Sequence, residues 1–163
     1  MNDTDLEIRL ATPDDMDEVM RLSIMACKDN GFLDFSPALL AAEVWPALHQ
    51  DHGLFALIGP RDGEAQGFVF LKIGTLFYST AQCLEEKCLW VHPDYRSAQG
   101  GRARKLLEFT KKTADTLQLP LIIGIFSTNR SEGKVALYRR TFGEPAGAFF
   151  LYGASCGVSK EVA

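Results

Sequence analysis

A strand, a glycine turn and a basic helix follow one another between Val91 and Phe109, and this succession restricts the possible folds more than any other part of the chain. The stretch reads VHPDYRSAQGGRARKLLEF, and four basic residues surround its adjacent glycines: Arg96, Arg102, Arg104 and Lys105. The first amides of a helix have no intrahelical partner, and the helix dipole turns its positive end toward them. A glycine turn lets a phosphate approach those amides. The stretch therefore predicts an anion site between a strand and a helix, with a solvated helix start as the alternative.

Two other phosphate-binding motifs are missing from the sequence. It contains no GxxxxGK[ST] and no GxGxxG after an early strand, which argues against a nucleoside triphosphatase loop and a dinucleotide-binding Rossmann unit. The net charge of -4 supplies no extended basic face for a nucleic acid. The positive charge is therefore local, as expected when the ligand is a small polyanion.

The chain has 163 residues, which is enough for one domain spanning residues 1–163 to bury its core without a metal or a disulfide. Its cysteines match neither a CxxC pair nor a zinc spacing, and we interpret them as reduced thiols: Cys27, Cys83, Cys88 and Cys156. The acidic N-terminal segment lacks the apolar stretch of a signal peptide, and no apolar run is long enough to span a membrane. We therefore expect a cytoplasmic protein with no metal and with no membrane or nucleic-acid partner.

Periodicity and capping signals predict a mixed α/β domain. Apolar runs predict strands at residues 6–10, 54–58, 67–73, 83–91, 121–126 and 148–152. Helical spacing predicts helices that begin at Thr12-Pro13, Ser36-Pro37, Gly101 and Ser131 and end near Cys27, His49, Leu117 and Arg140. The order β-α-α-β-β-β-α-β-α-β favours a mixed, mostly antiparallel central sheet with helices on both faces. The continuous apolar run at 121–126 predicts a central strand buried on both faces.

From Val91 to Arg96, and on through the glycines into the helix, the sequence resembles motif A of the GNAT N-acetyltransferases. That motif has Arg or Gln, two spacers, Gly, one spacer, and then Gly or Ala. Arg96 fills its first position and Gly101 its last, while Gln99 stands at the first glycine position, beside Gly100. The resemblance extends to the predicted order of elements along nearly the whole chain, and it is greatest to small members encoded by bacteriophages and prophages.

A second segment resembles the later part of the same family. Asn129 precedes a predicted helix that carries Leu137-Tyr138 ahead of Gly143, as in family members. By this resemblance Tyr138 is the general acid that protonates the leaving thiolate. The alternative is a core tyrosine on an amphipathic helix.

The resemblance implies acetyl-CoA as the co-substrate. Backbone groups of Leu89 and Val91 would pair with the pantetheine arm, and Asn129 would lie near it. Backbone amides would cradle the pyrophosphate, and the nearby basic side chains would meet the phosphates. The residues of this expected cradle are Arg96, Ser97, Ala98, Gln99, Gly100, Gly101, Arg102 and Ala103.

The general base is left open by the sequence. Two adjacent glutamates lie on the strand where some family members carry a catalytic glutamate. Strand alternation places Glu85 on one face with Leu89 and Val91, and Glu86 on the other face with Cys88. We predict Glu85 as the base, with deprotonation through water as an equal alternative.

The sequence therefore predicts an N-acetyltransferase that moves acetyl from acetyl-CoA to a primary amine of a small molecule, peptide or protein, as a monomer or a homodimer. The alternative is an acyl-CoA-binding module that acts as a sensor or interaction protein without turnover. Four aromatic residues either line an acceptor pocket or belong to the core: Phe32, Phe35, Trp45 and Phe55.

Overall fold

The computed structural model describes residues 6–30, 32–96, 101–127 and 131–153. Its sheet has the strand order β1-β2-β3-β4-β5. The strands are β1 (Leu6–Leu10), β2 (Gly53–Pro60), β3 (Gly67–Thr75), β4 (Gln82–Val91) and β5 (Leu121–Ile122). The first four pair antiparallel with their neighbours, and β5 runs parallel to β4. The expected mixed, mostly antiparallel sheet is therefore confirmed.

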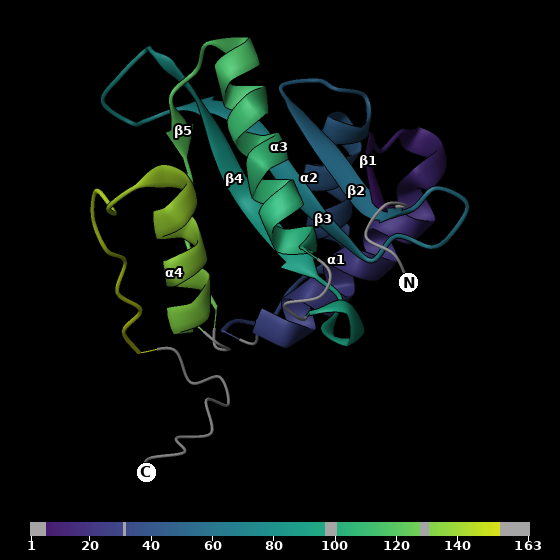
Figure 1. Ribbon diagram of the computed structural model, residues 1–163. Helices are drawn as coiled ribbons and strands as arrows, with labels where there is room; N and C mark the ends of the chain where they lie inside the picture. The colour runs from purple at the N-terminus through teal and green to yellow at the C-terminus, as the bar shows by residue number, and fades with distance from the viewer. Residues whose placement is uncertain (1–5, 31, 97–100, 128–130, 154–163) are drawn as a thin grey trace.

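Helices cover both faces of this sheet, as expected. The helices are α1 (Met16–Asn30), α2 (Pro37–Leu48), α3 (Arg102–Leu117) and α4 (Ser131–Phe142), with short 3₁₀ turns η2 (Pro13–Asp15) and η3 (Pro93–Tyr95). In Figure 1, α3 crosses one face of the sheet, α1 and α2 lie behind it, and α4 stands beside β5. Two core clusters correspond to these two faces.

Strict alternation along β2 and β3 builds both clusters from the same strands. Phe55 and Phe68 point toward α1 and α2, and their rings stack with centroids 4.7 Å apart. Ala56 and Val69, the next residues along each strand, point toward α3. All four side chains are buried, because the sheet is covered on both faces.

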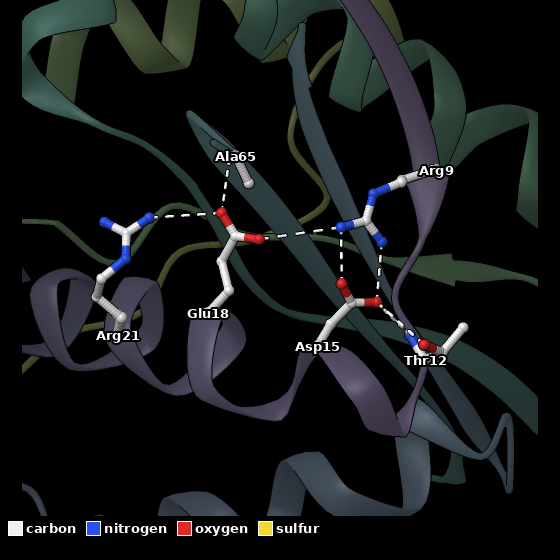
Figure 2. A network of polar contacts seen from close by, with 6 residues as sticks. All are labelled: Arg9, Thr12, Asp15, Glu18, Arg21 and Ala65. Carbon is white, nitrogen blue, oxygen red and sulfur yellow. Dashed lines mark hydrogen bonds and ion pairs between the residues drawn. The ribbon is translucent and has the colours of Figure 1, made fainter. Parts of the chain in front are cut away.

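A polar network fixes the first strand to the first helix (Figure 2). Arg9 on β1 donates two hydrogen bonds to the Asp15 carboxylate, at 2.8 and 2.7 Å. The backbone N–H of Thr12 also donates to Asp15, at 2.8 Å, which caps the start of the helix as the Thr12-Pro13 signal predicts. Glu18, one turn further along, accepts from the backbone N–H of Ala65 at 2.7 Å. The network therefore ties β1, α1 and the β2–β3 connection together.

The strand predicted at residues 148–152 is wrong. This segment is irregular in the structure, and its aromatic side chains are exposed: Phe149 is 87% and Phe150 is 94% accessible. A strand requires a partner ladder, and the neighbouring β5 pairs over only two residues. The Phe149 ring passes 4.0 Å from where a Cβ on Gly124 would stand, so the segment lies against the chain after β5 without pairing to it.

The predicted strand at residues 121–126 is also shorter and less buried than expected. Only Leu121 and Ile122 form β5, and both are partly exposed. β5 ends the strand order, so it is an edge strand and not the central strand predicted. An apolar run after a proline does not distinguish these two positions, because the number of neighbouring strands depends on the rest of the chain.

Strand β4 breaks the simple alternation that the sequence suggests. Phe70 pairs with Cys88 and Leu71 pairs with Glu86, so Lys87 is an extra residue that has no partner on β3. Such a bulge changes the direction of the side chains on either side of it. The predicted division of this strand into two faces therefore fails at Lys87.

Within the described residues, no helix has both the length and the apolar character needed to cross a membrane.

The capping network generates a stability prediction. Hydrogen bonds from Arg9 hold the pKa of Asp15 at about 2, below its ordinary 3.8, against the opposing effect of burial. Because this pKa is depressed, the carboxylate stabilises the fold above about pH 4 and loses that effect as the pH falls through about 2. Asp15→Asn should lower the free energy of unfolding at pH 7 by about 1–2 kcal/mol, as measured by urea denaturation.

Asp14→Asn is the matched control, because Asp14 is the exposed neighbour of Asp15 and the change removes the same charge. It should change the stability by less than about 0.5 kcal/mol. The Asp15→Asn deficit should shrink as the pH is lowered from 4 to 2, within the range set by the shifted pKa. An equal loss in both variants would contradict the network's role.

Candidate active site

The pairing between β4 and β5 stops after two residue pairs, Leu84 with Leu121 and Glu85 with Ile122. Beyond them the two chains part, and we call this point the strand fork. The backbone N–H of His92 donates to the Gln66 carbonyl next to β3, at 2.8 Å. Because backbone groups of successive residues alternate between the two edges of a strand, those of residues 89 and 91 face the β5 side, beyond the fork.

Leu89 and Val91 thus present peptide groups at the edge where the sequence predicts contacts with pantetheine. The Val91 carbonyl accepts from Arg96 Nε at 2.6 Å, which confirms that this residue faces away from β3. The Leu89 N–H donates to the carboxylate of Glu86. An extended ligand arm can add to such an edge as a further strand would.

The Glu86 carboxylate fills the strand fork. It accepts from the backbone N–H groups of Leu89, on β4, and Gly124, just after β5, where the strand ladder has ended. Its Oε2 also accepts from the Tyr138 hydroxyl on α4, at 3.2 Å. Burial raises the pKa of Glu86 to about 7, although all three hydrogen bonds oppose this rise. One carboxylate therefore joins β4, the chain after β5, and α4.

Tyr138 lies at the fork, where its hydroxyl contacts Glu86. It is partly buried, and its ring meets Phe142 edge-on with centroids 6.0 Å apart. Burial and the negative charge of Glu86 raise the pKa of Tyr138 well above its usual range, so its hydroxyl stays protonated at neutral pH. A protonated phenol is a proton donor with no competing charge of its own.

The structure does not bring the predicted base, Glu85, to Tyr138. The Glu85 carboxylate lies 3.1 Å from Lys87 Nζ, and on β3 the residue opposite is Lys72. Both side chains of the Glu85–Lys87 pair are more than one-third exposed. The bulge at Lys87 and these cationic neighbours account for this arrangement, and the carboxylate that meets Tyr138 is Glu86.

The start of α3 carries the expected backbone donors. Gly101 is the N-cap residue, with φ of 57°, a left-handed conformation that glycine adopts without strain. The first intrahelical bond runs from Lys105 N to Gly101 O, at 2.8 Å. The N–H groups of Arg102, Ala103 and Arg104 therefore precede the first helical donor and point toward the turn. Five other predicted site residues lie outside the described residues: Ser97, Ala98, Gln99, Gly100 and Asn129.

The side chain of Arg96 is engaged within the protein. Its Nη2 forms a short ion pair with Asp29 Oδ2, and its guanidinium lies 5.4 Å from the centre of the Trp90 ring. Trp90 Nε1 donates to the same Asp29 oxygen at 2.9 Å. Burial would raise the pKa of Asp29, but the hydrogen bonds from Arg96 and Trp90 outweigh it and hold that pKa below its usual range. Arg96 thus braces α1 against the end of β4.

Arg102 is also bound within the protein. Its Nε donates to Gln66 Oε1 at 2.7 Å, and its guanidinium lies 5.0 Å from the centre of the Tyr95 ring. Arg104 lies 3.7 Å from Glu108 on the exposed face of α3. Arg96 and Arg102 are therefore bound within the protein, whereas the backbone N–H groups at the start of α3 have no intrahelical partner.

The aromatic residues proposed for an acceptor pocket divide between core and surface. Phe55 is 1% accessible and belongs to the core, whereas Trp45 on α2 is 46% accessible. Phe32, in the α1–α2 connection, packs against Phe126 with ring centroids 4.2 Å apart. Phe126 follows β5, so this contact lies on the chain leading from the strand fork. Sequence reasoning could not predict that Phe32 contacts Phe126, because residues so far apart in the chain share no local sequence signal.

No three His, Cys, Asp or Glu side chains within the described ranges lie close enough to share a metal ion.

Several solved structures share this fold. A possible acetyltransferase from Clostridium difficile 630 has a TM-score of 0.68 at 16% identity, covering 90% of this chain and 96% of the other. AAC(6')-Iy, solved with the bisubstrate analog CoA-S-monomethyl-acetylneamine, has a TM-score of 0.67 at 16% identity, covering 93% and 99%. Ribosomal-protein-alanine N-acetyltransferase from Brucella melitensis biovar Abortus 2308 has a TM-score of 0.65 at 17% identity, covering 90% and 96%. A search of curated proteins finds no match.

The sequence itself matches a family model. The model describes the acetyltransferase (GNAT) family, and the match covers residues 20–143, which include most of α1, the whole of β4, the strand fork and α4. This is well over half of the chain, and the elements that form the candidate site fall within it. The chain therefore belongs to the GNAT acetyltransferase family.

Proposed function

We propose that this protein transfers an acetyl group from acetyl-CoA to a primary amine. The observation that carries the proposal is the position of Tyr138, whose hydroxyl lies at the strand fork beside the stretch of β4 that has no strand partner on the β5 side. The Tyr138 hydroxyl, a proton donor, thus lies close to the end of the β4–β5 pairing, where the peptide groups of Leu89 and Val91 face the β5 side.

The residues present suit acetyl-CoA, which supplies the acetyl group as a thioester. Peptide groups of Leu89 and Val91 would hold the pantetheine arm, since they face the β5 side where the ladder has ended. The amides at the start of α3 would bind the pyrophosphate, next to Gly101, whose lack of a side chain leaves the backbone accessible. We include the residues of the turn, 97–100, and Asn129 in this proposal on the family pattern.

The chemistry needs an unprotonated amine and a proton for the leaving sulfur. The amine nitrogen attacks the thioester carbon, and the bond between that carbon and sulfur breaks. Tyr138 is the residue that we propose as general acid toward the sulfur. Water removes the proton from the amine in our proposal, because Glu85 pairs with Lys87 and Glu86 is occupied by Tyr138.

The proposed acceptor is a small molecule or a peptide. Two of the similar structures are described as acting on such amines, one as an aminoglycoside acetyltransferase and one as a ribosomal-protein-alanine N-acetyltransferase. In this chain the Phe32–Phe126 pair would form the apolar part of the acceptor site, since it lies on the chain that leaves the fork. We propose a cytoplasmic monomer or homodimer, without nucleic acid or membrane as partner.

The function is tested by incubating the protein with acetyl-CoA and a panel of amines: polyamines, aminoglycosides, amino-acid amides and N-terminal peptides. Mass spectrometry should find at least one amine heavier by one acetyl group, with an equal amount of free thiol released. Calorimetric titration with acetyl-CoA is run in parallel. Binding without acetyl transfer to any amine would favour the acyl-CoA-binding module, and an absence of binding would overturn both interpretations.

The proposed pyrophosphate site predicts a charge effect at Gly101. Asp tolerates the left-handed conformation and caps helices well, so Gly101→Asp should keep α3 intact while placing a negative charge where the pyrophosphate binds. Its dissociation constant for acetyl-CoA should rise about 10-fold or more over that of Gly101→Asn, a cost of about 1.4 kcal/mol.

Gly101→Asn is the matched control, because it adds a side chain of the same size and conformational preference without the charge. Equal affinities of the two variants, measured by calorimetry, would show that the start of α3 does not face the pyrophosphate.

The proposed general acid predicts a separation of turnover from binding. Tyr138→Phe removes only the hydroxyl, so kcat should fall about 10²- to 10⁴-fold while the dissociation constant for acetyl-CoA stays within a factor of 3. The variant should remain folded by circular dichroism, since Tyr138 is only partly buried. An unchanged kcat would remove Tyr138 from the chemistry.

A further inference from the structure

The hydroxyl of Tyr138 is already engaged. A phenol carries one O–H, and in this structure it is donated to Glu86 Oε2 at 3.2 Å. A charged carboxylate can only accept hydrogen bonds, so while Glu86 is ionised the single proton of Tyr138 is directed toward it. Tyr138 cannot give the same proton to a sulfur in that state. A protonated Glu86 would reverse the bond and leave the Tyr138 proton free.

We propose that Glu86 is a positioning residue that acts through Tyr138: in its protonated form it donates to Tyr138 Oη, and it passes that proton to Tyr138 as Tyr138 protonates the leaving sulfur. This inference rests on the proposed function and refines it. It assigns no contact between Glu86 and the reacting atoms.

The transfer balances in protons and electrons. As the carbon–sulfur bond breaks, its electron pair goes to the sulfur, which takes the proton of Tyr138. Tyr138 Oη takes the proton of Glu86 in the same movement, and Glu86 is left as a carboxylate. The amine nitrogen loses its own proton to water, and Glu86, which is partly exposed, takes up a proton from solvent to complete the cycle.

The relay has a favourable direction that direct transfer lacks. The ordinary pKa of a phenol, about 10, is already above that of a thiol, about 8.5. Burial and the charge of Glu86 raise the pKa of Tyr138 further, so Tyr138 alone would give up its proton uphill. Burial raises the pKa of Glu86 to about 7, below that of the thiol. A net transfer from Glu86 to sulfur, with Tyr138 only passing a proton on, therefore runs downhill.

Three elements bring titratable or charged groups near the pair. These groups are Cys27 and Asp29 of α1, Glu85, Lys87 and Cys88 of β4, and Lys134 of α4. Burial raises the pKa of the Cys27 and Cys88 thiols above the ordinary 9.0, and the pKa of Asp29 is held below its usual range. Glu85 and Lys87 form an ion pair with each other, and Lys134 donates to Ser127. Of the shifted pKa values in this region, that of Glu86, at about 7, lies near neutral pH.

The geometry of the fork explains why Glu86 can hold a proton without losing its place. The N–H groups of Leu89 and Gly124 fix the carboxyl group from β4 and from the chain after β5. One carboxyl oxygen can keep accepting from these amides while the other donates to Tyr138. A neutral acceptor such as Gln could hold Tyr138 and α4 against the sheet equally well, so the structural role alone does not require the titratable carboxyl group of Glu86.

The inference is tested with Glu86→Gln, whose amide can hold Tyr138 but cannot supply a carboxyl proton. In the wild type, kcat should fall as the pH rises through about 7, as Glu86 ionises. In Glu86→Gln this limb should be absent, and kcat at pH 6 should be about 10- to 100-fold lower, with KM for acetyl-CoA within a factor of 3. The proposal would be overturned if kcat fell through about pH 7 in both the wild type and Glu86→Gln. It would also be overturned if the decrease in kcat disappeared in Glu85→Gln, because Glu85 would then be the titrating group.

A second readout needs no acetyl-CoA and no turnover. Carbon-13 NMR of the glutamate carboxyl groups in the free protein should show one signal, assigned by its loss in Glu86→Gln, that titrates near pH 7. In Tyr138→Phe this signal should titrate at a higher pH, because the hydrogen bond from Tyr138 lowers the pKa of Glu86. Titration of Glu86 at its ordinary pH, or no shift in Tyr138→Phe, would overturn the coupling even if acetyl transfer is confirmed. A coupled pair in a protein that acetylates no amine would instead overturn the proposed function alone.

Discussion

The early end of the β4–β5 pairing is the constraint from which the rest of the site follows. After two residue pairs the ladder stops, and the Glu86 carboxylate takes over as acceptor for the N–H groups of Leu89 and Gly124. A carboxylate is costly to bury, and it is tolerated here because three donors, including the Tyr138 hydroxyl, converge on it. The same side chain therefore contacts β4, the chain after β5 and α4 at the point where the strand pairing ends.

The second half of the site depends on where the basic side chains of the glycine turn go. Arg96 is held by Asp29, the Val91 carbonyl and the Trp90 ring, which joins α1 to the end of β4. Because this guanidinium is bound within the protein, the pyrophosphate that we propose at the turn would meet main-chain amides and the positive end of the α3 dipole.

The features that the sequence predicts correctly are local ones. Thr12-Pro13 and Ser36-Pro37 begin helices as expected, and alternation along β2 and β3 gives the two core faces. What sequence reasoning misses depends on distant partners. The bulge at Lys87 is set by the register between β3 and β4, and it decides which of two adjacent glutamates meets Tyr138. The pairing of Arg96 with Asp29 joins residues 67 positions apart, and the apolar segment after α4 lacks the partner ladder that would make it a strand.

The most direct test of this account is a crystal structure of the protein grown with coenzyme A. The account predicts the pantetheine arm along the edge of β4, bonded to backbone groups of Leu89 and Val91, with the thiol near the Tyr138 hydroxyl. The pyrophosphate oxygens should lie within hydrogen-bonding distance of the amides at the start of α3. Density for coenzyme A on another surface, or a β4 edge closed by the protein's own chain at saturating ligand, would contradict it.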